Sequence, residues 1–327
     1  MPAKKSFIFF LITWYLHSPI ACEEDSPSSP KTECLKYLKF LFVIVYLSLS
    51  TSLQAFEYQL SICTMFQNES LYIKDWIDYH RYMGVEHFWL YNDRSTDDYR
   101  TVLLPYIEKG VVELIEWPSV VTKDGWHDLT VVNQPEVFTD ALNKARGVSK
   151  WLAIIDTDEY IFPVQEATII DCLEARFTNC PGIRVNWQCY GTSHVAKIPE
   201  GTHIWDALLY KMPWDNKLNL YTKSIVQPNY VKNCPNPHFC NYLDGYQDVN
   251  THYKHSKNDS QSSIHIDILR INHYWTRDEW FLYHVRLPKR MSYERDTADF
   301  LLRRAEEMNE VFDDSLSQRM KFFSECN

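Results

Sequence analysis

The sequence predicts an α/β fold, Rossmann-like, with a mostly parallel sheet and helices on both faces. Four short apolar runs are rich in strand-forming residues: 60–65, 85–91, 111–117 and 151–155. Three segments between them have helical spacing: 71–83, 99–108 and 135–148. Strands that alternate with helices in this way are typical of βαβ units, whose strands pair in parallel. Gly84 and Gly110 follow the first two helical segments and end them.

The composition indicates a globular protein. Of 327 residues, 45% are hydrophobic and 23% are charged, close to globular averages. The net charge of −10 makes a nucleic acid an improbable partner, because polyanion binding rests on basic surfaces. Aromatic residues reach 15%, which suits an ordinary core and also suits stacking on sugars.

Two apolar segments, 7–16 and 38–53, precede the predicted domain, and lysines precede each of them. Both have cores of about ten residues, shorter than the roughly 20 that a spanning helix needs. We therefore expect residues 1–57 to form a signal or a membrane anchor and residues 58–327 to form the domain. A single-pass anchor is favoured over secretion, and the side of the membrane stays open. Cleavage after Ala55 is disfavoured because Leu53 is not small.

Nine cysteines include no CxxC pair, so they do not predict a zinc site. The nearest pairs, Cys172 with Cys180 and Cys234 with Cys240, are candidates for disulfides in an oxidising compartment. Spacing does not determine the connectivity.

Histidines are frequent between residues 229 and 265, a stretch that is rich in polar residues and predicted to be irregular. They are His238, His252, His255 and His265. A second metal site is one interpretation. Their irregular spacing favours solvated loop residues instead.

An acidic turn follows the strand predicted at 151–155. Asp156 and Asp158 are separated by one residue, which brings two carboxylates to the edge of the sheet. Such oxygen ligands suit Mg²⁺ or Mn²⁺ that also contacts diphosphate oxygens. Two aspartates with this spacing, taken alone, usually form only an acidic turn that caps the following segment. The apolar strand before it, and residues 160–163 closing the loop behind it, favour the metal site.

Polar residues also follow two other predicted strands. Asn68 and Glu69 come after the first strand, and Asn92 and Asp93 come after the second. Ligands of parallel sheets sit beyond the carboxyl ends of the strands, so these residues are candidates for a binding site. The alternative for Asn92 and Asp93 is capping of their own loop by Asx turns.

The ordered motifs resemble one known family. They are Cys63-Thr-Met-Phe-Gln-Asn-Glu, Trp76-Ile-Asp-Tyr-His80, Tyr91-Asn-Asp-Arg-Ser-Thr-Asp97, Trp151-Leu-Ala-Ile-Ile-Asp-Thr-Asp-Glu-Tyr160, Trp187-Gln-Cys-Tyr-Gly-Thr-Ser-His194, Lys223-Ser-Ile-Val-Gln-Pro228 and Ile271-Asn-His-Tyr-Trp275. Residues 58–290 thereby resemble glycosyltransferase family 92, also called the DUF23 domain. Gln67 and Tyr160 depart from the residues common in that family.

The resemblance implies a GT-A fold and an inverting transfer of a sugar, galactose in characterised relatives, from a UDP-sugar to a glycan or another hydroxyl acceptor. It also implies a divalent metal, Mn²⁺ or Mg²⁺. Asp156 and Asp158 would meet the ribose and the metal, with Asp158 as the more direct ligand, and His273 would complete the site. Four residues would line the uridine pocket: Asn68, Glu69, Asn92 and Asp93.

Other candidates carry weaker signals. Arg146 lies on the helix before the acidic strand and is a candidate donor contact, although a solvated helix face is the simpler interpretation. Lys223 is a candidate partner of the diphosphate. Three aromatic residues are candidates for stacking on the acceptor, or else belong to the core: Trp187, Tyr190 and Trp205.

An inverting transfer needs a carboxylate that accepts the proton of the acceptor hydroxyl. Asp206 is the first candidate, followed by Asp244 and Asp248. Two other functions stay open: a metal-dependent phosphoester hydrolase that uses the same acids and His273, and a noncatalytic carbohydrate-binding protein.

Overall fold

The computed structural model describes residues 56–118, 129–255, 263–291 and 297–326. They belong to one compact unit that begins at Phe56. The apolar segments predicted as a signal or anchor lie outside the described residues. Among the residues that are described, no helix is both long enough and apolar enough to cross a membrane.

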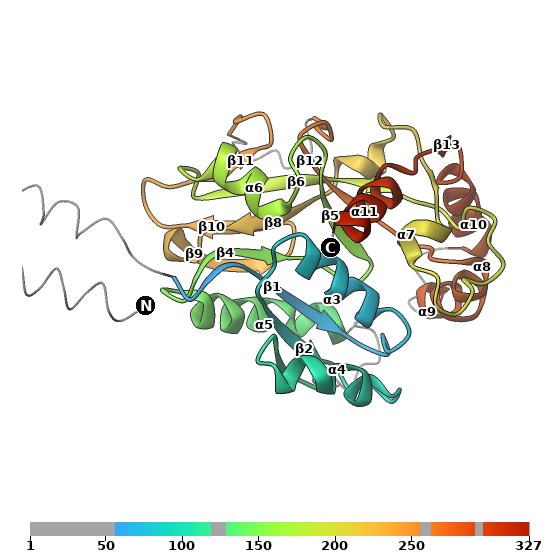
Figure 1. Cartoon of the computed structure of the whole chain (residues 1–327), viewed down its shortest axis with the longest axis horizontal. Helices are drawn as coiled ribbons and strands as arrows, with labels where there is room; N and C mark the ends of the chain where they lie inside the picture. Colours follow the sequence, from blue (N-terminus) through green and yellow to red (C-terminus); the bar gives the residue numbers. More distant parts are fainter. Residues whose placement is uncertain (1–55, 119–128, 256–262, 292–296, 327) are drawn as a thin grey trace, which may run out of the picture. The chain divides into compact units, whose positions relative to one another are not determined.

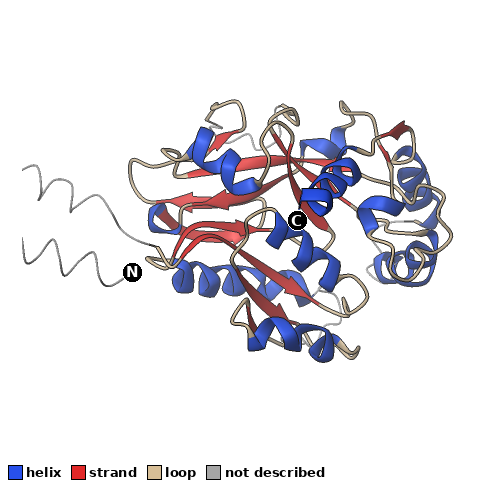
Figure 2. Ribbon diagram, viewed as in Figure 1, coloured by secondary structure: helices blue, strands red, loops and turns tan. Residues whose placement is uncertain are grey.

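A nine-stranded mixed sheet forms the centre of this unit (Figure 2). Its order is β3-β2-β1-β4-β8-β6-β12-β5, and β11 pairs with β6. The strands are β1 (Tyr58–Phe66), β2 (His87–Asn92), β3 (Val112–Glu116), β4 (Ser149–Ile154), β5 (Glu159–Pro163), β6 (Gly182–Cys189), β8 (Thr222–Val226), β11 (Val249–Asn250) and β12 (Leu269–His273). The first four in the order are parallel, as the sequence predicts.

Two antiparallel strands distinguish this sheet from a wholly parallel one. β8 runs antiparallel between β4 and β6, and β5 runs antiparallel beside β12. β12 itself pairs in parallel with β6. The sheet therefore brings the acidic turn between β4 and β5 next to β8 and β12, although these strands are far apart in the sequence.

Helices cover both faces of the sheet (Figure 1). Side chains of α3 (Ile73–Tyr82) and α4 (Tyr99–Glu108) pack in one buried cluster, and those of α5 (Leu129–Ala145) pack in another. Because side chains alternate along a strand, β1 contributes Ile62 to the first cluster and Cys63 to the second. The predicted α/β class is confirmed.

The carboxyl-terminal part adds short helices and two small two-stranded sheets. The helices are α6 (Ile169–Cys172), α7 (Ile204–Ala207), α8 (Glu279–Phe281), α9 (Leu287–Met291), α10 (Ala298–Glu307) and α11 (Ser315–Cys326), with η1 (Leu173–Phe177), η2 (Lys217–Leu220), η3 (Pro228–Tyr230) and η4 (Leu282–Arg286). The small sheets pair β9 (Val231–Asn236) with β10 (Phe239–Tyr242), and β7 (Tyr210–Lys211) with β13 (Val311–Phe312).

One of the two cysteine pairs considered above is bridged. A disulfide joins Cys234 on β9 to Cys240 on β10. Cys172 and Cys180 are free thiols.

Helix α3 is fastened to β5 by three side chains on one face. The indole of Trp76 donates a hydrogen bond to the Glu159 carbonyl (2.8 Å), and the Tyr79 hydroxyl donates one to the Ile161 carbonyl (2.8 Å). The Ile161 amide donates to Nε2 of His80 (3.3 Å), whose Nδ1 lies 2.8 Å from the Trp76 carbonyl. Spacings of three and four residues place these side chains together on the helix. The helix thus holds the strand that follows the acidic turn.

Protonation of His80 is expected to destabilise the fold. Burial lowers the pKa of His80 from 6.5 to about 3, so the folded protein holds a neutral imidazole while the unfolded chain takes up a proton below pH 6.5. The stability contributed by His80 is therefore complete above pH 6.5 and is lost as the pH falls toward 3. Urea unfolding between about pH 6 and pH 4 should show up to ~1.4 kcal/mol per pH unit more loss for the wild type than for His80→Gln. Equal slopes would contradict this.

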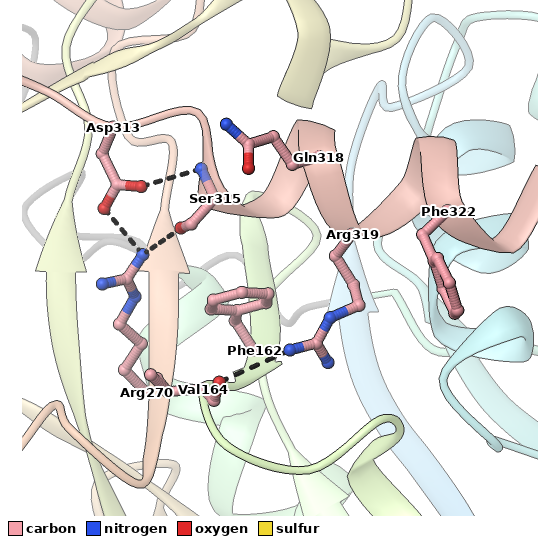
Figure 3. A pocket seen from close by; sticks show the side chains of 8 residues that line it. All are labelled: Phe162, Val164, Arg270, Asp313, Ser315, Gln318, Arg319 and Phe322. Atoms are coloured by element: carbon pink, nitrogen blue, oxygen red, sulfur yellow. Dashed lines mark hydrogen bonds and ion pairs between the residues drawn. The ribbon is translucent and has the colours of Figure 1, made fainter.

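A cavity of about 410 Å³ lies between α11 and two strands, the edge strand β5 and its neighbour β12 (Figure 3). Arg270 donates hydrogen bonds to Asp313 (2.9 Å) and to the Ser315 hydroxyl (3.0 Å). Arg319 lies over the Phe162 ring, 5.4 Å from its centroid, and donates to backbone carbonyls at residues 164, 166 and 167. Both guanidinium groups bond to other groups of the protein, so the cavity lies where α11 packs on the sheet.

Replacing Arg270 by methionine should cost about 3 kcal/mol of unfolding free energy, because it leaves the Asp313 carboxylate largely buried with only Lys211 as a charged partner. Urea titration measures the loss. The matched control is Arg100→Met, which breaks an exposed pair with Glu116 and should cost under about 1 kcal/mol. Similar losses for the two variants would contradict the assignment.

Candidate functional site

The acidic turn between β4 and β5 is held by a lysine from β8. The Lys223 ammonium lies 2.6 Å from an Asp156 oxygen and 3.3 Å from a Glu159 oxygen. Glu159 also accepts a hydrogen bond from the Asp156 amide (2.8 Å). The antiparallel register places Ile154 opposite Ser224, so Lys223, which precedes Ser224 on β8, reaches the turn that follows β4. Lys223, predicted to meet a diphosphate, is only 1% exposed and offsets part of the negative charge of the turn.

Asp158 meets two cationic side chains from the carboxyl-terminal part of the chain. Arg286 lies 2.6 Å from one carboxylate oxygen, and Nε2 of His273 lies 3.5 Å from the other. The Tyr274 amide donates a hydrogen bond to the Asp158 carbonyl (2.8 Å). His273 is the last residue of β12 and pairs with Glu159 on β5. The sheet thus brings His273 to the turn that holds Asp156 and Asp158, as the metal-site prediction requires.

Electrostatics keep Asp158 and His273 ionised as a pair. Burial alone would raise the pKa of Asp158, but the charge and hydrogen bond of His273, followed by the charge of Arg286, hold that pKa well below its usual range. Burial alone would lower the pKa of His273, and the charge of Asp158 instead raises it to about 10. Burial raises the pKa of Glu159 to about 7, although Lys223 opposes the shift.

The donor set of Asp158 and His273 fits a divalent cation. The carboxylate oxygen and the imidazole nitrogen are 3.5 Å apart, short enough for one cation to contact both. A mixed oxygen and nitrogen set suits Mn²⁺ better than Mg²⁺, which strongly prefers oxygen ligands. Because metals take the neutral imidazole, metal binding would displace the proton of His273.

A second buried ion pair ties the loop after β1 to the segment after β12. Glu69 pairs with the guanidinium of Arg277, which is fully buried. The guanidinium carbon lies 3.9 Å from the Tyr72 ring centroid and 4.6 Å from that of Phe281. Burial raises the pKa of Glu69, and Arg277 opposes that shift. A predicted uridine-pocket residue therefore has a buried protein partner.

The arginines of these pairs, Arg277 and Arg286, are absent from the sequence prediction. A weak signal exists for Arg277, which stands two residues after Trp275, the end of the last quoted motif. Arg286 carries no such signal, because it lies on η4, a segment outside all of the quoted motifs. Only the packing of that segment shows that it reaches Asp158.

The other predicted uridine-pocket residues shape neighbouring loops. The Asn92 amide donates to the Tyr99 hydroxyl (2.9 Å) and to Glu116 (2.7 Å), and its oxygen accepts from the Ser95 amide (3.1 Å). Asn68 has φ of 56° and accepts a hydrogen bond from the Thr96 amide (2.7 Å).

Asp93 is fully buried, with the Arg94 side chain 3.0 Å away. It lies with Asn68 and Asn92 at the adjacent ends of β1 and β2, where Phe66 pairs with Asn92. Their contact with a nucleotide stays a prediction.

Asp206, the first candidate for the catalytic base, lies on the wrong face of the sheet. It accepts a hydrogen bond from the Ser317 hydroxyl (2.5 Å). Its neighbour Trp205 is packed 6.0 Å from the Tyr160 ring. Tyr160 and Glu159 are consecutive on β5 and so project from opposite faces. The prediction for Asp206 is therefore corrected, because this helix packs behind the strand that carries the site.

The two other base candidates are also displaced. Asp244 is exposed in the turn after β10. Asp248 pairs with Arg184 on β6 at 3.0 Å. Arg184 lies opposite Ser224, the neighbour of Lys223, so the side chains of Arg184 and Lys223 project from opposite faces. The carboxylate of Asp248 therefore lies on the face opposite to Lys223 and does not face the acidic turn.

Arg146 lies at the other end of β4 from the acidic turn. Its guanidinium donates hydrogen bonds to the carbonyls of Val231 (2.7 Å) and Lys232 (3.1 Å), and to Asn143 (2.5 Å). These bonds join the end of α5 to β9. The predicted donor contact is corrected, because Arg146 follows α5 and precedes the start of β4 rather than its carboxyl end.

The three candidate acceptor aromatics separate into two groups. Trp187 is half-buried, with its ring 4.2 Å from that of His273 and 5.1 Å from that of Tyr221. Tyr190 and Trp205 are buried and belong to the core. Only Trp187 is therefore placed beside the candidate metal site.

The histidines of residues 229–265 do not form one cluster. His238 lies near Trp187, with its Nδ1 2.7 Å from the Thr222 carbonyl. His252 and His265 instead meet Asp267, and one ligand atom of each lies within 4.8 Å of the others. All three residues are at least partly exposed, as the interpretation of solvated loop histidines expects, and metal binding by this trio stays a prediction.

Comparisons with known proteins agree on one family. The family model described as glycosyltransferase family 92 matches residues 57–301. A glycosyltransferase family 92 protein of Ricinus communis is 25% identical over 213 residues, which are 61% of this chain and 36% of that protein. Galactan beta-1,4-galactosyltransferase GALS2 of Arabidopsis thaliana is 31% identical over 100 residues, which are 30% of this chain and 18% of that protein. The chain thus spans little more than a third of the Ricinus protein.

Among solved structures, S. aureus TarS 1-349 in complex with UDP-GlcNAc matches with a TM-score of 0.34 and 12% identity, over 63% of this chain and 62% of that one.

Proposed function

The chain belongs to glycosyltransferase family 92, and from this we propose that it is a metal-dependent enzyme that transfers a sugar from a UDP-sugar to a hydroxyl of a glycan. The observation that carries the proposal is the meeting of Asp158, His273 and Arg286 at the carboxyl end of β4. Family membership alone does not require these side chains to converge. Their convergence supports the proposal of a site that takes a cation and a diphosphate.

The residues of the site have distinct roles in this proposal. Asp158 and His273 would hold the cation, which supplies positive charge to the leaving diphosphate. Arg286 lies against Asp158 and adds a second positive charge at the same place. Lys223 pairs with both Asp156 and Glu159, which holds the turn in place before any ligand binds. These fixed charges need little reorganisation when the sugar leaves.

Galactose is the proposed sugar, because two relatives carry the name galactan beta-1,4-galactosyltransferase. An inverting outcome is proposed from the family resemblance.

Apolar residues 38–53 support a further proposal, that a single-pass segment anchors the enzyme to a membrane. Alkaline carbonate should then fail to extract the full chain, and extraction would overturn the anchor.

Calorimetry of the full-length chain tests the function. UDP, UDP-galactose, UDP-glucose and UDP-GlcNAc are titrated with and without Mn²⁺. The proposal expects binding that requires the metal and is tightest for one UDP-sugar. A folded chain that binds none of them would overturn it. Turnover of a simple phosphodiester without any sugar acceptor would instead favour the hydrolase.

A further inference from the structure

A groove of about 660 Å³ runs between η2 and α10. Aromatic rings stand on both sides of it: Tyr221 is 38% exposed and Phe300 is 42% exposed. Exposed aromatic faces at the edge of a groove are suited to stacking on sugar rings.

The groove adjoins the candidate metal site. The ring of Tyr221 stacks on Trp187, with centroids 5.1 Å apart, and Trp187 contacts the His273 ring at 4.2 Å. Leu218 from η2 and Met308, just beyond α10, pack in the same apolar cluster as Trp187. A ligand on Tyr221 is therefore two ring contacts from His273, close to the site where the donor would react.

Three cations and one carboxylate are found among the described residues that line the groove. The cations are Lys217, Arg303 and Arg304, and the carboxylate is that of Glu307. Within the described part of the chain, none of the three makes an ion pair, although the protein carries a net charge of −10. Arg304 lies over the Phe300 ring, 5.2 Å from its centroid. Unpaired cations grouped in this way attract an anionic ligand.

We propose that this groove binds the acceptor and that the acceptor is an acidic glycan. Its sugar rings stack on Tyr221 and Phe300, and its carboxylate or phosphate groups pair with Arg303, Arg304 and Lys217. This inference rests on the proposed transferase function and adds the chemical class of the acceptor. A neutral glycan would leave three cations of the groove without a partner.

Binding of defined oligosaccharides to the full-length chain tests the groove. The probes are tetragalacturonate, a mannose 6-phosphate oligosaccharide and neutral galactotetraose, each titrated with and without UDP and Mn²⁺. The charge-reversal variant is Arg303→Glu with Arg304→Glu. Its matched control is Lys109→Glu with Lys232→Glu, which reverses two exposed lysines outside the groove.

The wild type should bind at least one acidic probe about tenfold more tightly than galactotetraose at low ionic strength, with the difference shrinking at about 0.5 M salt. Arg303→Glu with Arg304→Glu should remove that preference, and the control should keep it. Whichever acidic probe binds more tightly identifies carboxylate or phosphate as the recognised group.

Two results would overturn the inference: acidic probes that bind no more tightly than galactotetraose, or a preference that survives the reversal in the groove. UDP binding is recorded separately in the same samples. Failure of UDP to bind counts against the proposed function, whereas the comparison of acidic and neutral probes decides the groove by itself.

Discussion

Asp158→Asn is expected to abolish metal-dependent UDP binding and to lower the rate of sugar transfer about 1,000-fold, or ~4 kcal/mol of transition-state stabilisation. The substitution removes the only carboxylate that contacts both His273 and Arg286 among the described residues. A neutral amide there leaves two cationic groups facing the metal site. Calorimetry with UDP and Mn²⁺, together with a transfer assay, measures both effects.

The control for Asp158→Asn is Glu108→Gln, which removes one negative charge from an exposed position at the end of α4. It should bind UDP and transfer sugar as the wild type does. Metal-dependent UDP binding that persists in a folded Asp158→Asn variant would contradict the assignment of Asp158 as a metal ligand.

Arg277→Met should destabilise the protein by about 3–5 kcal/mol, because it leaves the buried carboxylate of Glu69 without its partner. It also removes a cation that lies between the rings of Tyr72 and Phe281. Urea unfolding measures the loss. Since Glu69 lies in the loop after β1, UDP binding should weaken in the same variant.

A double variant distinguishes pairing from simple loss of packing. Arg277→Met combined with Glu69→Gln should recover part of the loss, because no unpaired buried charge remains. Lys74→Met breaks an exposed pair with Asp78 and should cost under about 1 kcal/mol. A double variant whose loss equals the sum of the two single losses would show that the ion pair itself contributes nothing.

The contacts of α3 with β5 give the motif Trp76–His80 a structural role near the acidic turn. Hydrogen bonds join the backbone of β5 to three side chains of α3: Trp76, Tyr79 and His80. These residues belong to a helical motif that precedes the turn by about 80 residues. In the sequence they predict only an amphipathic helix. Their role in holding the turn depends on β5, and the sequence predicts residues 160–163 of that strand only as the end of a loop.

The sequence by itself determined the features that depend on short windows of residues. The period of apolar residues predicts the four parallel strands and the helices between them, because that period reflects which face is buried. The residues after each strand predict which side chains gather at the sheet edge, since parallel strands end at the same edge. Asp156 and Asp158 were recognisable for this reason, whereas His273 was predicted only through the family resemblance.

Only the tertiary structure decided which charges meet. The antiparallel insertion of β8 places Lys223 at the turn, and the packing of η4 brings Arg286 to Asp158. The packing of α7 removes Asp206 from the site, because Asp206 meets Ser317 and Trp205 packs on Tyr160. Strand register decides which face a side chain takes, and a shift of one residue reverses it. No short window of sequence contains that information, because it depends on contacts between segments far apart in the chain.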